Sequence, residues 1–388
     1  MKTRQLAGRS LGAALLLVAV PAALADISYT QHIQVDAAGG MSLFASEGDI
    51  QTQVSGDKSR SDSQVTMKSK LAGMFAGSGE TGSIARLDKA LTWQLFPADR
   101  EYSELTFAQA RAQLAEARQS MQKSQPGAGL PVSAEGCQWT DQKLEVEHPA
   151  GEEDVAGIPT TRHIIRMRQT CTDPQAKTSC DITWLMETSL AEQVPGEQEV
   201  RNFRQGFAAA MGLDDLSRQV EGPARGLLAM FGSNWETVVK EFEKLKGYPL
   251  RTVMQMGIGG EQCTTASGQP IALDGIWADA STAAYNAAVD QTGSEAGYAV
   301  GEAAGEALGG SVAGSIGGAA VGAAAGKLIG GLTGMFHKSP TADAPAPKPS
   351  KTADSQITAF RISSEVTRWS DGDIPADRFE IPAGWSKR

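Results

Sequence analysis

A run of glycines at every fourth position constrains this chain more than any other feature of its sequence. Glycine recurs between residues 293 and 334, first from 293 to 309 and then from 310 to 334, in steps of four. Residues four apart lie nearly above one another on a helix, so the repeat removes Cβ atoms from one stripe and lets a second backbone approach closely. Interior glycine costs roughly 0.8–1.0 kcal/mol relative to alanine, so a helix here requires close packing against a partner. The pattern is a glycine zipper and indicates association rather than chemistry. We expect the helix–helix contact to be made by Gly297, Gly301, Gly305, Gly310, Gly314, Gly318, Gly322, Gly326 and Gly330.

Three interpretations of the zipper stay open. As helix, residues 293–334 would extend roughly 63 Å, enough for two membrane crossings. Three acidic side chains, Glu295, Glu302 and Glu306, share one helical face and are costly in hydrocarbon. The zipper is therefore a packed helical hairpin or oligomer contact, an element that inserts into or attaches to the outer membrane, or a disordered segment.

The N-terminus has the pattern of a secretory signal peptide. Lys2, Arg4 and Arg9 precede an apolar run over residues 11–20, and small residues at 23–25 suit cleavage. We expect residues 1–25 to be removed, which places the protein in the periplasm or in association with the outer membrane. The remaining 32 basic and 45 acidic side chains give a net charge near −13. That charge argues against nucleic acid as a partner.

Four cysteines, Cys137, Cys171, Cys180 and Cys263, favour disulfides over a metal site in an oxidising compartment. No zinc-type spacing is present, and neither His148 nor His163 has a recognisable partner at ligand spacing, so we expect no metal and no cofactor.

Alternating apolar and polar residues predict strands through most of the chain. The N-terminal third is expected to be an antiparallel meander, with strands at 27–35, 41–54, 63–67, 84–87 and 91–95. Thr106 and Gln109 form a capping box, so a helix begins there; it either completes the core or covers a cavity as a lid. Residues 197–247 are predicted to be helical, with Phe203, Phe207 and Met211 on one face.

A second group of strands is predicted at 139–148, 161–171 and 180–188. Opposing Cys171 and Cys180 across the intervening loop pairs Met167 with Trp184 and Ile165 with Met186, so that a single register aligns both apolar faces. We therefore predict a Cys171–Cys180 disulfide and, by elimination, a Cys137–Cys263 disulfide.

The later part of the chain returns to strand at 250–258 and 357–366. The segment between them combines the zipper with a Pro/Ala-rich linker at 338–355, which is expected to be extended. This gives five regions: a signal peptide (1–25), a sheet domain (26–290), the glycine-zipper insertion (291–337), the linker (338–355) and a C-terminal strand and tail completing the sheet (356–388).

Several short stretches resemble the LolA/LppX-like superfamily of envelope proteins, especially its secreted, non-lipidated relatives. In the first half these are residues 54–60 (VSGDKSR), 85–88 (ARLD) and 95–102 (LFPADREY). The middle supplies 155–159 (VAGIP) and 247–250 (GYPL), and the C-terminus supplies 379–385 (FEIPAGW). The similarity covers roughly residues 26–275 and 356–388.

The resemblance implies an α+β fold: a curved antiparallel sheet, or half-barrel, wrapped round helices, with an apolar concave face. Better-known members carry acyl chains or lipoproteins through the periplasm, so a bound apolar ligand or lipid is expected. Residues expected to line its cavity are Trp93, Phe107, Leu114, Ile165, Met167, Trp184 and Met186. The family has no catalytic residues to transfer.

We therefore expect a non-enzymatic envelope protein that binds an apolar or acyl ligand. The alternative is a structural or membrane-interacting protein that self-associates, or contacts the outer membrane, through its zipper.

Overall fold

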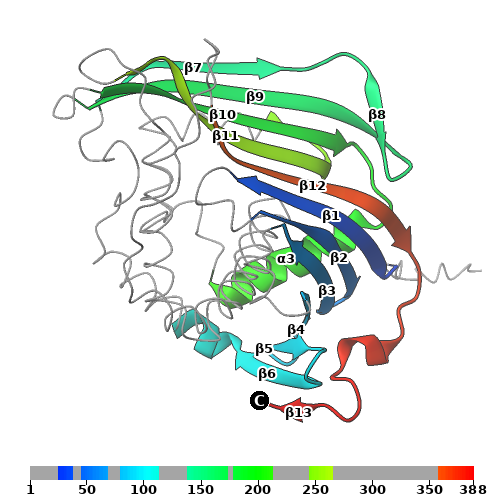
Figure 1. Cartoon of the computed structure of the whole chain (residues 1–388). Helices are drawn as coiled ribbons and strands as arrows, with labels where there is room; N and C mark the ends of the chain where they lie inside the picture. Colours follow the sequence, from blue (N-terminus) through cyan, green and yellow to red (C-terminus); the bar gives the residue numbers. More distant parts are fainter. Residues whose placement is uncertain are drawn as a thin grey trace, which may run out of the picture.

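The computed structural model describes residues 25–37, 45–68, 79–112, 138–173, 178–212, 244–264 and 357–388. Most of them belong to one curved, unclosed sheet (Figure 1). Its strands are β1 (Ile27–Ala37), β2 (Ser46–Ser55), β3 (Lys58–Met67), β4 (Glu80–Arg86), β5 (Leu91–Phe96), β6 (Glu101–Thr106), β7 (Gln138–Glu147), β8 (Glu152–Val155), β9 (Ile158–Asp173), β10 (Thr178–Ala191), β11 (Tyr248–Thr264), β12 (Ile357–Asp371) and β13 (Ser386–Lys387).

The strand order is β13-β6-β5-β4-β3-β2-β1-β12-β11-β10-β9-β7, and β8 pairs with β9 off this path. Neighbours are antiparallel except β13 and β6, which are parallel, so the sheet is mixed. The C-terminal strand β12 lies between β1 and β11. Its predicted return to the sheet is therefore confirmed, and residues 265–356 connect two strands that are neighbours in space.

Helix α3 (Glu197–Met211) lies in the hollow of the sheet, against the face that we call the inner face (Figure 1). Its buried side chains include Phe203, Phe207 and Met211, the apolar face expected from the sequence. They join Ile27 and Tyr29 of β1 in the largest apolar cluster of the described residues, which we call the helix-covered cluster. Because side chains alternate along a strand, this contact fixes which residues of each strand face inward.

Gly196 precedes α3 with a positive φ of 68°, a conformation that favours glycine. A Cβ added there would come within 2.2 Å of the Cδ1 atom of Ile27. The turn therefore needs glycine both for its backbone angle and for the close approach of the helix to β1.

The helix predicted to begin at the Thr106–Gln109 capping box is present. Residues 107–112 are helical. Thr106 N–H donates to Oε1 of Gln109 at 2.9 Å, and Gln109 N–H donates to Oγ1 of Thr106 at 3.2 Å. The predicted capping box is therefore confirmed.

The predicted disulfide pairing is wrong. Cys180 bonds Cys263 of β11, with an S–S distance of 2.05 Å, which excludes both Cys171–Cys180 and Cys137–Cys263. Cys171 of β9 does lie directly opposite Cys180, as expected. However, β10 also pairs with β11 on its other side, and the disulfide forms to that strand. The β10–β11 register shifts beside Cys180, between Ser179 and Asp181, where β11 holds the other sulfur. Cys171 is also disulfide-bonded, and Cys137 lies outside the described residues.

The predicted fold class is confirmed only in its coarser part. The curved sheet is present, but it is mixed rather than antiparallel, and helices contribute little to the described residues. The signal peptide, the glycine zipper with its contact glycines, the linker and Leu114 lie outside those residues. In the described ranges no helix combines the length and apolar character needed to cross a membrane.

Candidate ligand-binding face

The inner face carries a second apolar area beyond the reach of α3. Two rows of side chains cross neighbouring strands there, because the register pairs Ile165 with Met186 and Met186 with Met254, and Met167 with Trp184 and then Met256. We call this area the inner apolar patch. It consists of Leu144, Val146, Ile165, Met167, Ile182, Trp184, Met186, Met254, Met256 and Ile362.

The strands of the patch are β7, β9, β10, β11 and β12. Four strand spacings of about 4.8 Å make it about 19 Å wide, and its long axis crosses the strands. Four methionines supply flexible, polarizable side chains that adapt to irregular apolar shapes. Met167 and Met256 are only 3% and 1% exposed, so an apolar ligand reaches the patch only when the fold opens locally.

The structure separates the seven predicted cavity residues. Ile165, Met167, Trp184 and Met186 lie together in the inner apolar patch. Phe107 lies in the helix-covered cluster, where its ring meets that of Phe207 edge-on at 5.6 Å.

Trp93 faces the opposite side of the sheet. It pairs with Ile84 and packs with Phe379, whereas the next residue of β4, Ala85, belongs to the helix-covered cluster. Trp93 therefore cannot line a cavity on the inner face. An aromatic side chain does not by itself reveal which face of the sheet it lies on.

A row of polar side chains borders the inner apolar patch on the side toward α3. The register aligns His163 of β9 with Thr188 of β10, Thr252 of β11 and Ser364 of β12. We call these residues, together with His148, the polar row. Ser364 accepts a hydrogen bond from Nε2 of Gln31 at 3.4 Å. The row divides the inner face into an area covered by α3 and an area that α3 does not cover.

The polar row contains a contact that sequence reasoning missed. Nδ1 of His148 and Nδ1 of His163 are 2.8 Å apart, and their rings meet nearly at right angles. Burial, and then the neighbouring His148, hold the pKa of His163 below its usual value. No motif in the sequence marks this contact. It depends on the pairing of β7 with β9, in which Glu147 opposes Ile164 and the next pair is His148 and His163.

One polar group lies within the apolar area. Gln169 is 2% exposed and opposes Ile182 on the inner face. In the described part of the chain its Oε1 atom has no hydrogen-bond partner. A buried unsatisfied carbonyl costs about 1–3 kcal/mol, so this oxygen favours a hydroxyl, an amide or a water as its partner.

The outer face is closed by the C-terminal segment. The short 3-10 helix η4 (Ala376–Phe379) inserts Phe379 between Ile84, Trp93 and Leu95. Beyond it, β13 adds to the edge of β6.

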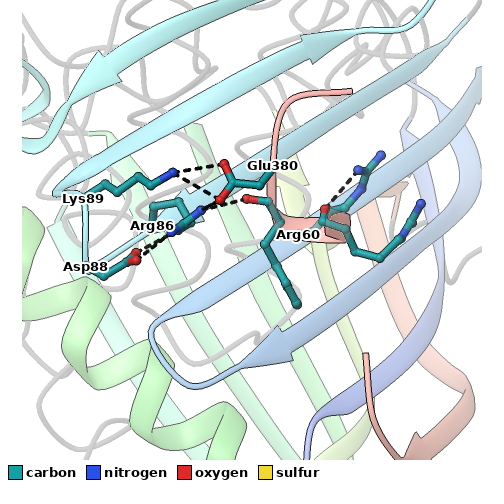
Figure 2. Close-up of polar contacts among 7 residues, drawn as sticks. Arg60, Arg86, Asp88, Lys89 and Glu380 are labelled. Atoms are coloured by element: carbon teal, nitrogen blue, oxygen red, sulfur yellow. Dashed lines mark hydrogen bonds and ion pairs between the residues drawn. The ribbon is translucent and has the colours of Figure 1, made fainter. Parts of the chain in front are cut away.

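Two arginines fasten η4 to the sheet, as Figure 2 shows. Arg86 makes a bidentate pair with Asp88, at 2.8 and 2.6 Å, and donates to the carbonyl of Phe379 at 3.1 Å. Arg60 repeats the arrangement with Asp62, at 2.8 Å for both bonds, and with the carbonyl of Arg378 at 3.1 Å. The sequence signal is the repeated R-x-D at 60–62 and 86–88.

Glu380 completes this fastening. Its carboxylate accepts from Arg86 and from Nζ of Lys89, at 3.2 and 3.0 Å. Hydrogen bonds from Arg86 lower the pKa of Asp88. Burial raises the pKa of Glu380, but the bonds from Arg86 and Lys89 outweigh it and leave a lowered pKa. Every charge here is paired within the protein, which indicates a structural role.

A polar hollow of about 400 Å³ lies elsewhere on the sheet. It is lined by Thr30, Asp49, Gln51, Asp62, Ser63, Gln64, Glu80, Thr81, Pro97 and Arg368. Within the described ranges, no three or more His, Cys, Asp or Glu side chains converge as a metal-ligand set. Four of the predicted cavity residues meet instead in the inner apolar patch, which is therefore the candidate binding face.

No family model matches the chain, and neither a curated protein nor a solved structure is detectably similar to it.

Proposed function

We propose that this protein is a secreted envelope protein of the LolA/LppX-like kind that binds an apolar or acyl ligand on the inner face of its sheet and catalyses no reaction. The observation that carries the proposal is the inner apolar patch, in which four of the predicted cavity residues meet. Ligand sites are concave and mainly apolar, with a few placed polar groups. The patch has that composition, with Gln169 as a buried polar group and the polar row at its border.

The dimensions of the patch favour an acyl chain. It is longest across the strands, where two rows of apolar side chains run from β7 to β11 and Ile182 begins a third, so an extended hydrocarbon fits it better than a compact ring system. The Cys180–Cys263 disulfide agrees with an oxidising compartment such as the periplasm. The signal-peptide pattern of residues 1–25 supports the same location.

The test is binding of a fluorescent fatty-acid probe to delipidated protein. Met186 and Leu185 are adjacent on β10 and both half-buried, but only Met186 faces inward. A charge in the patch disfavours an apolar ligand, so we expect Met186→Glu to weaken probe binding by at least about tenfold. Leu185→Glu is the matched control and keeps the affinity.

Wild-type protein that binds no probe overturns the proposal. Equal loss of affinity in both variants also overturns it, because the effect would then not belong to the inner face. Circular dichroism and thermal melting of each variant establish that the sheet is intact.

The second candidate is a protein that self-associates or contacts the outer membrane through the glycine zipper, as the repeat over residues 293–334 favours. The structure makes a clean deletion feasible: Ile258 of β11 pairs with Ile357 of β12, so shortening the connection leaves both strand partners in place. Removing residues 293–334 should then abolish membrane sedimentation or oligomerisation. Unchanged fractionation contradicts this function and leaves the ligand-binding proposal untouched.

A further inference from the structure

The His148–His163 pair is a cluster of metal-ligating atoms outside the proposed ligand patch. The two Nδ1 atoms face each other at 2.8 Å, the ring centroids are 5.0 Å apart, and the ring planes meet at 81°. The arrangement is built by the sheet, because His163 lies within β9 and His148 directly follows β7. Pairing of β7 with β9 therefore determines how close the two rings lie.

The chemistry of this contact is restricted. A neutral imidazole carries one N–H and one lone pair, so one Nδ1 donates and the other accepts. A metal ion replaces the bridging proton when both Nδ1 lone pairs point toward the same site. With metal–nitrogen bonds of about 2.0–2.1 Å, two ligands of a tetrahedral Zn²⁺ ion are about 3.3 Å apart, and two adjacent ligands of a square-planar Cu²⁺ ion are about 2.9 Å apart. From 2.8 Å, the two nitrogens therefore need to separate by at most about 0.5 Å, which a side-chain rotation supplies.

The surroundings suit a metal ion with an incomplete protein shell. His148 is exposed and His163 partly so, so an ion and its waters have access from solvent. Imidazole nitrogen is a common ligand for first-row transition-metal ions, and water supplies the remaining positions where the protein offers only two ligands.

We propose that His148 and His163 together bind one first-row divalent transition-metal ion, Cu²⁺ or Zn²⁺, through their two Nδ1 atoms, with water completing the coordination. Imidazole suits both ions, and Cu²⁺ binds the more tightly of the two. The proton on the donor Nδ1 moves through solvent to Nε2 of the same ring. Between two neutral rings, binding therefore releases no net proton.

The experiment uses the full mature chain with His337 replaced by alanine throughout, so that only three histidines remain. Isothermal titration calorimetry with CuCl₂, repeated with ZnCl₂, compares this background with His148→Ala and His163→Ala. A second imidazole held in place acts at high effective concentration. We therefore expect each variant to bind at least about tenfold more weakly.

His32→Ala is the matched control. Its ring is also exposed and lies on a strand, but its Nδ1 meets Oδ1 of Asp49 at 2.9 Å rather than a second imidazole. We expect its affinity for Cu²⁺ to equal that of the background.

Electron paramagnetic resonance of the Cu²⁺-loaded background should show superhyperfine splitting from two nitrogens, and the splitting should become that of one nitrogen in His148→Ala. Equal affinities in all four proteins overturn the proposal. So does a spectrum of the background protein with one nitrogen ligand or none, a result that does not depend on how any ring-deletion variant folds. Probe binding by the inner apolar patch is measured without metal, so failure of either proposal is separable from failure of the other.

Discussion

Replacing Phe379 by alanine tests whether the C-terminal segment is held by apolar burial or by its ion pairs. The Phe379 side chain is 1% exposed, and its neighbours Ile84 and Leu95 are fully buried. Truncating a buried phenylalanine costs about 3–5 kcal/mol, because transfer energy is lost and a cavity remains. The polar fastening of η4 by Arg60 and Arg86 is unchanged by this substitution.

The expected result is local rather than global. A loss of about 3 kcal/mol corresponds to a factor of roughly 100–200 in an equilibrium constant. The apolar packing of this segment centres on Phe379, with Ile374, Ile381 and Trp385 partly buried around it. Its polar contacts come from Arg60 and Arg86, from Arg378 to Gln53 and Asp62, and from β13. Opening of this segment should therefore become about 100-fold more frequent, while the inner face stays protected.

Hydrogen exchange followed by mass spectrometry measures this directly. Peptides covering residues 374–388 should exchange about 100-fold faster in Phe379→Ala, and peptides from β9 to β11 should not change. Ile381→Ala is the control, since Ile381 packs against the same cluster but is only partly buried. Equal exchange in the two variants would refute the reasoning, because it would mean that the ion pairs hold the segment.

Three further predictions concern the same fold. Arg86→Met removes the bidentate pair with Asp88 and the bond to the carbonyl of Phe379; partner exposure limits the cost to about 2 kcal/mol in denaturant unfolding. The pKa values of Asp88 and Glu380 are lowered in the folded state, so their stabilisation is present above their unfolded pKa values and is lost as pH falls through the folded ones. The melting temperature of the wild-type protein should therefore fall below about pH 4. It should fall less steeply in Arg86→Met, because that variant has already lost most of this stabilisation. Gly196→Ala should lower stability by more than Gly157→Ala, as measured by denaturant unfolding, because both glycines have positive φ but only Gly196 lacks space for a Cβ.

Sequence periodicity predicted much of the sheet because its inner and outer faces differ in polarity. The alternation of β1 is real, and the pairings of Met167 with Trp184 and of Ile165 with Met186 are those expected. Strand β6 was missed because Pro97 and a polar turn precede a six-residue segment with little apolar alternation. Local patterns identify strands that bury one face, and they fail for short edge strands.

The disulfide error has a different cause. Aligning the apolar faces of β9 and β10 predicts which residue of β9 lies opposite Cys180, and it correctly placed Cys171 there. That alignment carries no information about β11, the neighbour of β10 on its other side. In the sequence β11 is separated from β10 by α3. The pairing with Cys263 is a long-range property of strand order, as is the meeting of His148 with His163.

The polar row explains why one helix does not fill the inner face. A helix of fifteen residues is about 22 Å long, whereas the twelve strands that follow one another across the sheet extend about 53 Å from edge to edge. Val200, Phe203 and Phe207 therefore cover only the apolar area on one side of the row. Thr188, Thr252 and Ser364 are poor partners for an apolar helix face, so α3 gains nothing by extending across them. The inner apolar patch therefore lies outside the area that α3 covers, and its rows of methionine side chains across the strands make an acyl chain the ligand to test first.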